Sequence, residues 1–454
     1  MENKNYLKKL ILVFLILFQI QGLTAQSLKS LAEANGKYIG NLMRDGFFND
    51  HHIYNGATDL IAKTEYNALV TGNKMKMSNL LKDRPVNPFN VQISDINTYN
   101  IDRFVAYADL NGMKKRGHVM IWYKQIPTWL QNEAPTWTAQ QVYDFSKSYV
   151  KALSTYCVGK IDEWDVLNEA MVSGGYRTGT WYDIVNTQAN DSGQIGYITF
   201  FAELFKSARE GDTTVPLFYN DFGIEPFGTN KNNLMRNMVK DLKNGHIAPI
   251  NGVGLQAHFE VSDMTSTFIN NVGLTIDDLG TSGFTVNLTE LDIRICDGDG
   301  TTLEDQRVAY RDIVSTAFSR SNCNTILIWG MSDNDSWIPG HKPGCGQATP
   351  HDEFFQKKPA YYGIQAALSL LGVDSPGIFN NSIKLYPNPV KDLLTIASVL
   401  NIEKIEVFNM LGQKSLVQNG TSNTMDTSSL SKGVYIVKIN FQDNKFSTKR
   451  LIKN

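Results

Sequence analysis

The sequence predicts a (β/α)8 barrel followed by a small all-β domain, and three observations support this fold class. Between about residues 36 and 370, short apolar segments rich in β-branched residues alternate with longer segments whose apolar residues recur three and four positions apart. The short segments number eight, which is the number of strands that closes such a barrel. Near residue 372 the pattern changes to alternating, turn-rich runs that are typical of a small β-sandwich.

Each candidate strand is a short apolar run bounded by polar or turn-forming residues. In order along the chain the eight are residues 38–43, 67–71, 115–122, 161–169, 216–221, 252–258, 284–292 and 325–332. Residues 140–156 and 198–208 have the apolar spacing of helices that pack one face against the strands. The 454 residues therefore divide into a barrel (residues 28–372), a linker (373–382) and a C-terminal domain (383–454).

The composition excludes several classes of protein. Apolar residues make up 42% and charged residues 19% of the chain, a balance that excludes large-scale disorder. The formal net charge is −2 and no long basic run occurs, so neither nucleic acid nor an anionic membrane is an expected partner. The sequence has no metal-ligand spacing and no glycine-rich phosphate loop, so we expect no metal and no cofactor.

The N-terminus has the features of a secretory signal peptide, residues 1–25. Three lysines precede the apolar run of residues 10–20, and small residues follow it around Ala25. A membrane anchor is the alternative, but the run is about half of the roughly 20 residues that span a bilayer. We therefore expect a protein that is secreted or held at the cell surface, without a membrane span in its mature form.

Four cysteines are too few and too widely spaced for a disulfide framework. Export permits a disulfide without requiring one. The predicted pair is Cys296 with Cys323, because both lie near ends of adjacent candidate strands.

Chemically capable side chains recur at the C-terminal ends of the candidate strands. Trp122, Glu169, His258 and Glu290 are examples from four different strands. Because the C-terminal ends of parallel strands meet at one mouth of a barrel, these side chains are predicted to converge on a single cleft.

Glu169 and Glu290 each end an apolar strand where solvent and ligand can reach. Two carboxyl groups that face one cleft are the minimum equipment for hydrolysis of a glycosidic bond, and this chemistry needs no metal or organic cofactor. For either glutamate alone, a surface salt bridge is the alternative interpretation.

The sequence motifs around these two glutamates resemble those of a known enzyme family. WDVLNEA, which contains Glu169, resembles the acid/base motif of glycoside hydrolase family 10, and TELDIR, which contains Glu290, resembles the nucleophile motif of that family. Further resemblances follow in the expected order over residues 28–372, in RGHVMIWYKQIPTW, LFYNDF, GVGLQAHF, ILIWGMSDNDSW and KPAYYGI. The resemblance implies a retaining endo-β-1,4-xylanase with Glu169 as general acid/base and Glu290 as nucleophile. Their carboxyls should then lie about 5 to 5.5 Å apart.

The resemblance also assigns roles to residues around the carboxyls. It implies that Asn168 binds the 2-hydroxyl of the reacting sugar, that His258 holds the nucleophile ionised, and that Gln256 makes a second contact there. Asp165 and Asp292 are expected to be structural partners. The remaining implied xylan-binding residues are Asn73, Lys76, His118, Trp122, Gln125, Trp329 and Trp337.

The chain departs from the family pattern at two places. Gly72 stands where the family usually has Glu, and Tyr123-Lys124 stands where it has His-Ser. Both changes fall in the substrate-binding wall, so we expect bond-breaking chemistry to be kept and the strength or preference of the upstream subsites to change. A catalytically inactive glycan-binding barrel and a β-glucanase remain as alternative functions.

Residues 383–454 resemble the C-terminal sorting domain of the type IX secretion system. The resemblance rests on LYPNPV, VFNMLGQ, GVY and the closing KRLIK. A carbohydrate-binding module is the competing interpretation, but this segment has no Trp for a sugar-stacking platform. The resemblance implies that the secretion machinery is a second partner, beside the xylan substrate.

Overall fold

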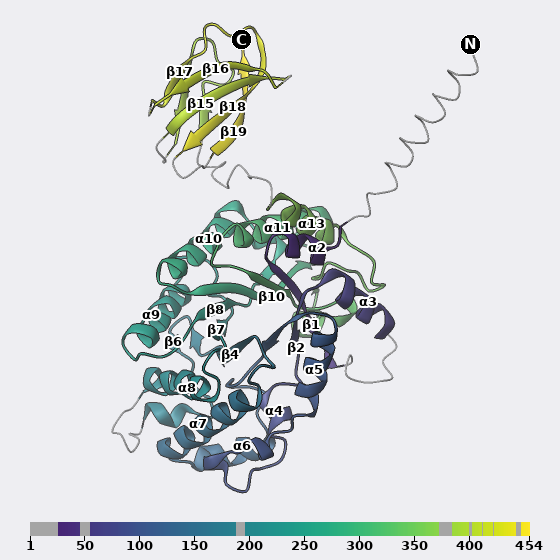
Figure 1. The fold of residues 1–454 in the computed structure, drawn as a ribbon, viewed down its shortest axis with the longest axis vertical. Coiled ribbons are helices and arrows are strands. Elements are labelled where there is room, and N and C mark those ends of the chain that lie inside the picture. Colours follow the sequence, from purple (N-terminus) through teal and green to yellow (C-terminus); the bar gives the residue numbers. More distant parts are fainter. Residues whose placement is uncertain are drawn as a thin grey trace, which may run out of the picture. The chain divides into compact units, whose positions relative to one another are not determined.

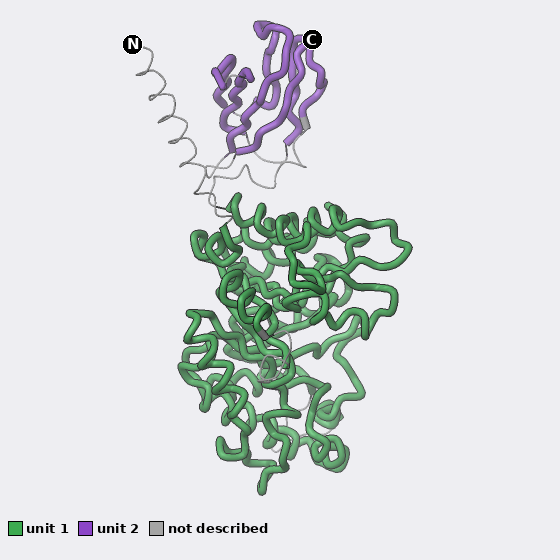
Figure 2. Tube along the Cα trace, turned by 90° about the vertical axis from the view of Figure 1, so that its right-hand side faces the viewer, with its two compact units in different colours: residues 1–371 green, residues 372–454 purple. Residues whose placement is uncertain are grey.

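The computed structural model describes residues 26–45, 55–187, 196–371, 384–398, 402–410, 412–420, 422–441 and 446–454. The chain divides into two compact units, residues 1–371 and 372–454 (Figure 2). The predicted signal peptide and the predicted linker lie outside the described residues.

Eight parallel strands close into a barrel in the first unit. They are neighbours in chain order, and the last, β11, pairs with both β10 and β1. The strands are β1 (Tyr38–Met43), β2 (Ala68–Thr71), β3 (Lys114–Gly117), β4 (Glu163–Asn168), β7 (Leu217–Asp221), β8 (Gly252–Leu255), β10 (Thr285–Cys296) and β11 (Thr325–Ile328). Each of the eight predicted strands overlaps one of them, so the predicted barrel is confirmed.

Helices surround the barrel and cover its outer face (Figure 1). Strands β2, β8 and β11 are fully buried as a result, which explains their nearly continuous apolar sequences. The helices are α2 (Leu28–Ala34), α3 (Asn55–Glu65), α4 (Met77–Leu80), α5 (Tyr99–Leu110), α6 (Thr128–Glu133), α7 (Ala139–Tyr156), α8 (Tyr197–Gly211), α9 (Asn230–Asn244), α10 (Ser266–Thr281), α11 (Leu303–Phe318), α12 (Ile338–His341) and α13 (Pro359–Leu370).

Helix α7 illustrates how the sequence specifies these elements. Thr138 and Gln141 form a capping box at its start, in which each side chain accepts the backbone N–H of the other residue. The buried residues Val142, Phe145 and Tyr149 then recur three and four positions apart and face the core. Helices α7 and α8 include the two segments for which the sequence predicts helical packing.

In the described part of the chain, four short strands lie at the C-terminal mouth of the barrel. β5 (Met171–Val172) and β6 (Gly175–Tyr176) form a hairpin after β4, and β9 (His258–Glu260) extends the pairing of β8 with β10. β12 (Cys345–Gly346) pairs antiparallel with the last residues of β10.

The observed disulfide joins Cys296 to Cys345, so the predicted pairing of Cys296 with Cys323 is wrong. Cys296 ends β10 at the C-terminal mouth of the barrel, whereas Cys323 precedes β11 and lies at the opposite end. Adjacent parallel strands place the end of one far from the start of the next. Cys323 is buried and unpaired, as is Cys157.

The second unit is all-β, as predicted. One antiparallel sheet contains β13 (Lys384–Tyr386), β14 (Leu393–Ala397) and β17 (Thr424–Asp426); the other contains β16 (Lys414–Asn419), β15 (Ile402–Asn409), β18 (Gly433–Phe441) and β19 (Phe446–Lys453). Both sheets contribute to one apolar core, with Ile396 from the first and Val437 from the second fully buried. In neither unit is any described helix both long enough and apolar enough to span a bilayer.

Candidate active site

A cleft of about 910 Å³ opens at the C-terminal ends of the barrel strands. All twelve site residues named from the sequence line it, although they come from six separate stretches of chain. They are Asn73, Lys76, His118, Trp122, Gln125, Asn168, Glu169, Gln256, His258, Glu290, Trp329 and Trp337.

The two glutamates enter the cleft from β4 and β10. Glu169 directly follows β4 and has a left-handed backbone, with φ of 54°. Its N–H donates to the carbonyl of Asn220 (2.9 Å), and its own carbonyl accepts from Nε of Arg177 (2.7 Å). Glu290 lies within β10; the two residues are only 8% and 5% exposed, respectively.

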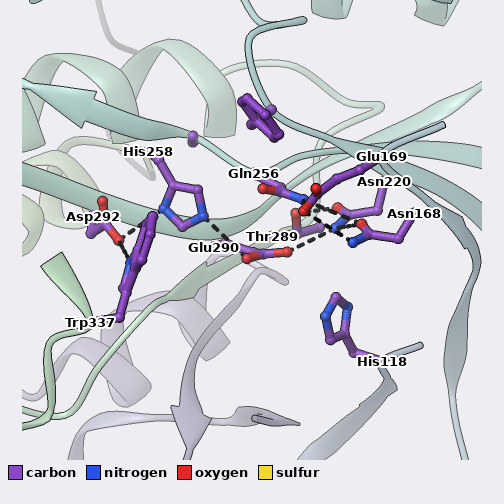
Figure 3. A network of polar contacts seen from close by, with 12 residues as sticks. His118, Asn168, Glu169, Asn220, Gln256, His258, Thr289, Glu290, Asp292 and Trp337 are labelled. Atoms are coloured by element: carbon purple, nitrogen blue, oxygen red, sulfur yellow. Dashed lines mark hydrogen bonds and ion pairs between the residues drawn. The ribbon is translucent and has the colours of Figure 1, made fainter. Parts of the chain in front are cut away.

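Three amide side chains connect the two carboxyls (Figure 3). Nδ2 of Asn220 donates to Oε1 of Glu290 and to Oδ1 of Asn168, both at 2.8 Å. Nε2 of Gln256 donates to that same Asn168 oxygen (3.3 Å) and to Oε1 of Glu169 (3.2 Å). The orientation of each carboxyl is therefore coupled to that of the other through hydrogen-bonded amides.

Asn220 has a larger part in this site than the sequence suggested. The sequence places it at a strand end but assigns it no role. In the structure its amide is oriented by Thr289, whose hydroxyl donates to Oδ1 of Asn220 at 2.6 Å. The available signal was the position of Asn220 in the mouth-facing string LFYNDF.

His258 lies between two carboxyl groups. Its Nε2 is 3.2 Å from Oε2 of Glu290, and its Nδ1 is 2.9 Å from Oδ2 of Asp292. The indole Nε1 of Trp337 donates to the same oxygen of Asp292 (2.8 Å). Asp292 thus orients both the imidazole and one tryptophan of the cleft.

These contacts shift the ionisation of His258 and Glu290 in opposite directions. Burial alone would lower the pKa of His258, but Asp292 and Glu290 outweigh it and raise that pKa to about 10. Burial alone would raise the pKa of Glu290, yet the hydrogen bond from His258, the charges of His118 and His258, and the amide of Asn220 hold it below its usual value. At neutral pH the site therefore contains an ionised Glu290 beside an imidazolium.

His118 connects the cleft to a buried ionic network in the barrel interior. Its Nδ1 is 3.0 Å from Oδ2 of Asp165, and the guanidinium of Arg116 donates to both oxygens of that carboxylate. Arg116 also pairs with Glu163 (2.7 Å), which in turn pairs with Lys114 (2.6 Å). Buried charges are tolerated only when paired and hydrogen-bonded in this way.

One wall of the cleft is a polar cluster built on Asn73. Its Oδ1 accepts from Nζ of Lys76 (3.2 Å) and Nε2 of Gln125 (3.0 Å). Its backbone N–H and its side-chain amide both donate to Asp45 (3.2 Å each). Nothing in the sequence indicated that Asp45 belongs to the site. A Cβ at Gly72 would lie 3.8 Å from Oδ1 of Asp45, so Asp45 occupies the space beside the glycine.

Aromatic rings complete the cleft. Trp337 packs edge-on against His258, with centroids 4.9 Å apart, and Trp329 contacts both His258 and His118. Nζ of Lys76 lies 4.8 Å from the ring of Trp122. No three His, Cys, Asp or Glu side chains of the described segments are grouped to hold a metal ion.

Residues 27–367 match the family model for glycosyl hydrolase family 10. The chain belongs to this family. It is therefore a glycoside hydrolase, and the family resemblance of its motifs is confirmed. Residues 384–454 match a second model, that of a secretion system C-terminal sorting domain.

Curated relatives of this family 10 chain are named endo-1,4-beta-xylanases. Endo-1,4-beta-xylanase B of Thermotoga neapolitana is 30% identical over 312 residues, covering 67% of this chain and 81% of the relative. Endo-1,4-beta-xylanase A of Phanerodontia chrysosporium is 30% identical over 344 residues, covering 74% and 76%.

Solved structures of similar fold include two bacterial xylanases. Xylanase 10B of Thermotoga petrophila, in complex with xylobiose, superposes with a TM-score of 0.66 at 26% identity, over 75% of this chain and 97% of that one. Native xylanase 10B of Thermotoga maritima gives 0.66 at 27% identity, over 75% and 98%.

Proposed function

We propose that this family 10 hydrolase is a retaining endo-β-1,4-xylanase that cuts internal bonds of xylan by double displacement. The observation that carries the proposal is the pairing of Glu169 and Glu290 in one cleft, with the imidazolium of His258 against Glu290. The names of the curated relatives and the xylobiose-bound homologue support xylan as the substrate.

In the first step Glu290 is the nucleophile. Its carboxylate oxygen bonds to the anomeric carbon while the bond to the leaving sugar oxygen breaks, and Glu169 gives its proton to that oxygen. The lowered pKa of Glu290 keeps the attacking oxygen unprotonated at neutral pH. The products are a glycosyl ester on Glu290 and a released sugar chain.

In the second step water breaks the ester. Glu169, now a carboxylate, accepts a proton from the water as its oxygen bonds to the anomeric carbon, and Glu290 leaves as a carboxylate. Two inversions return the original configuration. Asn168, oriented by Asn220 and Gln256, can hold the 2-hydroxyl of the reacting sugar, a contact that strengthens as positive charge develops on the sugar.

Two tryptophans of the cleft give a reason to expect a preference for xylose over glucose. Trp329 and Trp337 would crowd the hydroxymethyl group that glucose carries and xylose lacks. Such a steric difference contributes at most a few kcal/mol, so weak hydrolysis of glucan is compatible with the proposal. The Asn73 cluster offers amide and ammonium donors to sugar hydroxyls upstream of the cut.

Reducing-end assays of the purified barrel on xylan and on barley glucan test the proposal. New reducing ends mainly from xylan are expected; none from any glycan would favour a binding protein, and faster release from glucan would favour a β-glucanase. Glu290→Ala should abolish turnover, and azide should restore it with an inverted product. Full activity of that variant would exclude Glu290 as the nucleophile.

We further propose that residues 1–25 direct export from the cytoplasm and that the C-terminal domain directs passage through the type IX secretion system. The match of residues 384–454 to a sorting domain supports the second part. Deleting these residues in a bacterium with that system should retain the enzyme behind the outer membrane; undiminished release would contradict the proposal.

A further inference from the structure

The turn between β8 and β9 has an unusual backbone. Ala257 is fully buried and has φ of 63°, a left-handed conformation that a residue with a Cβ disfavours. The residues on either side each contact one carboxyl of the site: Gln256 donates to Glu169, and His258 contacts Glu290. The left-handed alanine therefore lies between two residues that each contact one of the glutamates.

The sheet does not provide an acceptor for the N–H of this alanine. Leu255 pairs with Leu288 and His258 with Asp292, so the ladder between β10 and the β8–β9 segment is irregular where Ala257 falls. The carbonyl of Ala257 accepts from the N–H of Asp292 (3.3 Å). Its N–H donates instead to Oε1 of Glu225 at 2.9 Å.

Glu225 comes from the loop between β7 and α9 and does not line the cleft. It is only 2% exposed. Burial raises its pKa, while the N–H of Ala257 and the positive charges of His258 and Lys231 oppose this. Lys231 is itself bound to Asp221 (2.8 Å). Burial of a carboxyl group costs free energy unless the group is hydrogen-bonded. The hydrogen bond from the N–H of Ala257 therefore stabilises the buried carboxyl of Glu225, and it also satisfies a buried backbone donor.

We propose that Glu225 is a positioning residue, which holds Ala257 in its left-handed conformation and thereby aims Gln256 at Glu169 and His258 at Glu290. The proposal rests on the proposed function in that these two glutamates are taken as the reacting pair. Without the acceptor, the peptide at Ala257 is released from its hydrogen bond to Glu225, and both flanking side chains move together.

The test compares Glu225→Ala with Glu65→Ala. Glu65 is a matched control because it is 6% exposed, accepts a backbone N–H from Leu28 (3.0 Å) and does not line the cleft. With an aryl β-xylobioside, Glu225→Ala should lower kcat/KM by up to about a hundredfold, mainly through kcat, as expected when reacting groups are misplaced. Both limbs of its pH profile should also move. Glu65→Ala should lower Tm without moving either limb.

Two conservative variants separate positioning from folding. Glu225→Gln keeps an acceptor oxygen and should recover most of the activity. Glu225→Asp keeps the charge but shortens the reach by one CH2, so it carries the test if Glu225→Ala does not fold. The proposal would be overturned if Glu225→Ala had the wild-type kcat and the wild-type pH profile. If Glu225→Ala does not fold, the same result in Glu225→Asp would overturn it.

A spectroscopic readout keeps this test independent of the proposed activity. ¹⁵N NMR of labelled histidines, with His258 assigned through its Gln variant, should show altered His258 titration in the folded Glu225 variant chosen above and not in Glu65→Ala. An unaltered His258 signal in that variant would overturn the positioning role. Absence of hydrolysis by the wild-type protein would instead refute the proposed function.

Discussion

Replacing His258 by Gln should make the nucleophile harder to ionise. Glutamine can still donate a neutral N–H toward Oε2 of Glu290, but it cannot supply the positive charge that His258 carries at neutral pH. Glu290 is almost fully buried, so the loss of this charge is poorly compensated by water. The acidic limb of the kcat/KM profile, which reports ionisation of Glu290, should therefore move to higher pH.

The size of the effect follows from the kind of contact that is lost. A hydrogen bond to a charged group contributes about 1.5–3 kcal/mol and a neutral one about 1 kcal/mol. The difference of about 0.5–2 kcal/mol corresponds to a rise of roughly 0.4–1.5 pH units in the acidic midpoint, since one pKa unit is about 1.4 kcal/mol.

The assay is kcat/KM for an aryl β-xylobioside between pH 3 and pH 9, below the Tm of the variant. His246→Gln is the control, because His246 lies outside the cleft and its nearest carboxylate is 3.9 Å away. An acidic midpoint in His258→Gln that equals the wild-type value would refute the charge argument.

The raised pKa of His258 also predicts a pH dependence of folding stability. In the wild-type protein the stabilisation from the contact of His258 with Asp292 and Glu290 should be fully present below pH 6.5 and lost as pH rises toward 10, a loss that His258→Gln should not show.

Two further predictions concern the substrate wall and the acid stability of the barrel. Asp45→Ala removes the acceptor that orients Asn73 and should raise KM for xylotetraose about 5- to 30-fold with little change in kcat. The control is Asp59→Ala on the outer helix α3, which should leave KM unchanged. An unchanged KM in Asp45→Ala would exclude a role for Asp45 in substrate binding. Burial lowers the pKa of His351 to about 4, so its contribution is fully present above pH 6.5 and falls by up to about 3 kcal/mol as pH drops toward 4. The urea concentration at the midpoint of unfolding should therefore fall less between pH 7 and pH 4.5 in His351→Leu than in the wild-type protein. An equally steep fall in the variant would contradict this assignment.

The sequence predicted the barrel well because several strands, such as β2, β8 and β11, are buried on both faces and appear as continuous apolar runs. The predicted strand ends were less accurate. The run 115–122 leaves the regular ladder after Gly117, and Ile121 makes only an isolated bridge to Leu167. The run 252–258 is broken by the left-handed Ala257, which no pattern of hydrophobicity encodes.

The site was predictable where residues fall in recognisable strings, and all twelve named residues line the cleft. Asp45 and Glu225 were not predicted, because each acts on a residue about thirty positions away through a contact that only the folded chain creates. The disulfide was mispredicted for a similar reason: proximity of strand ends depends on strand direction, which the spacing of cysteines does not reveal.

The bond between Cys296 and Cys345 ties the segment after Trp337 to the strand that carries Glu290. The attachment of the segment after Trp337 therefore depends on the redox conditions that the chain meets, since thiols remain reduced in a cytosol and form disulfides in oxidising compartments. Protein matured inside a reducing cell would contain every residue of the active site and still lack the covalent bond between this segment and the strand that carries Glu290.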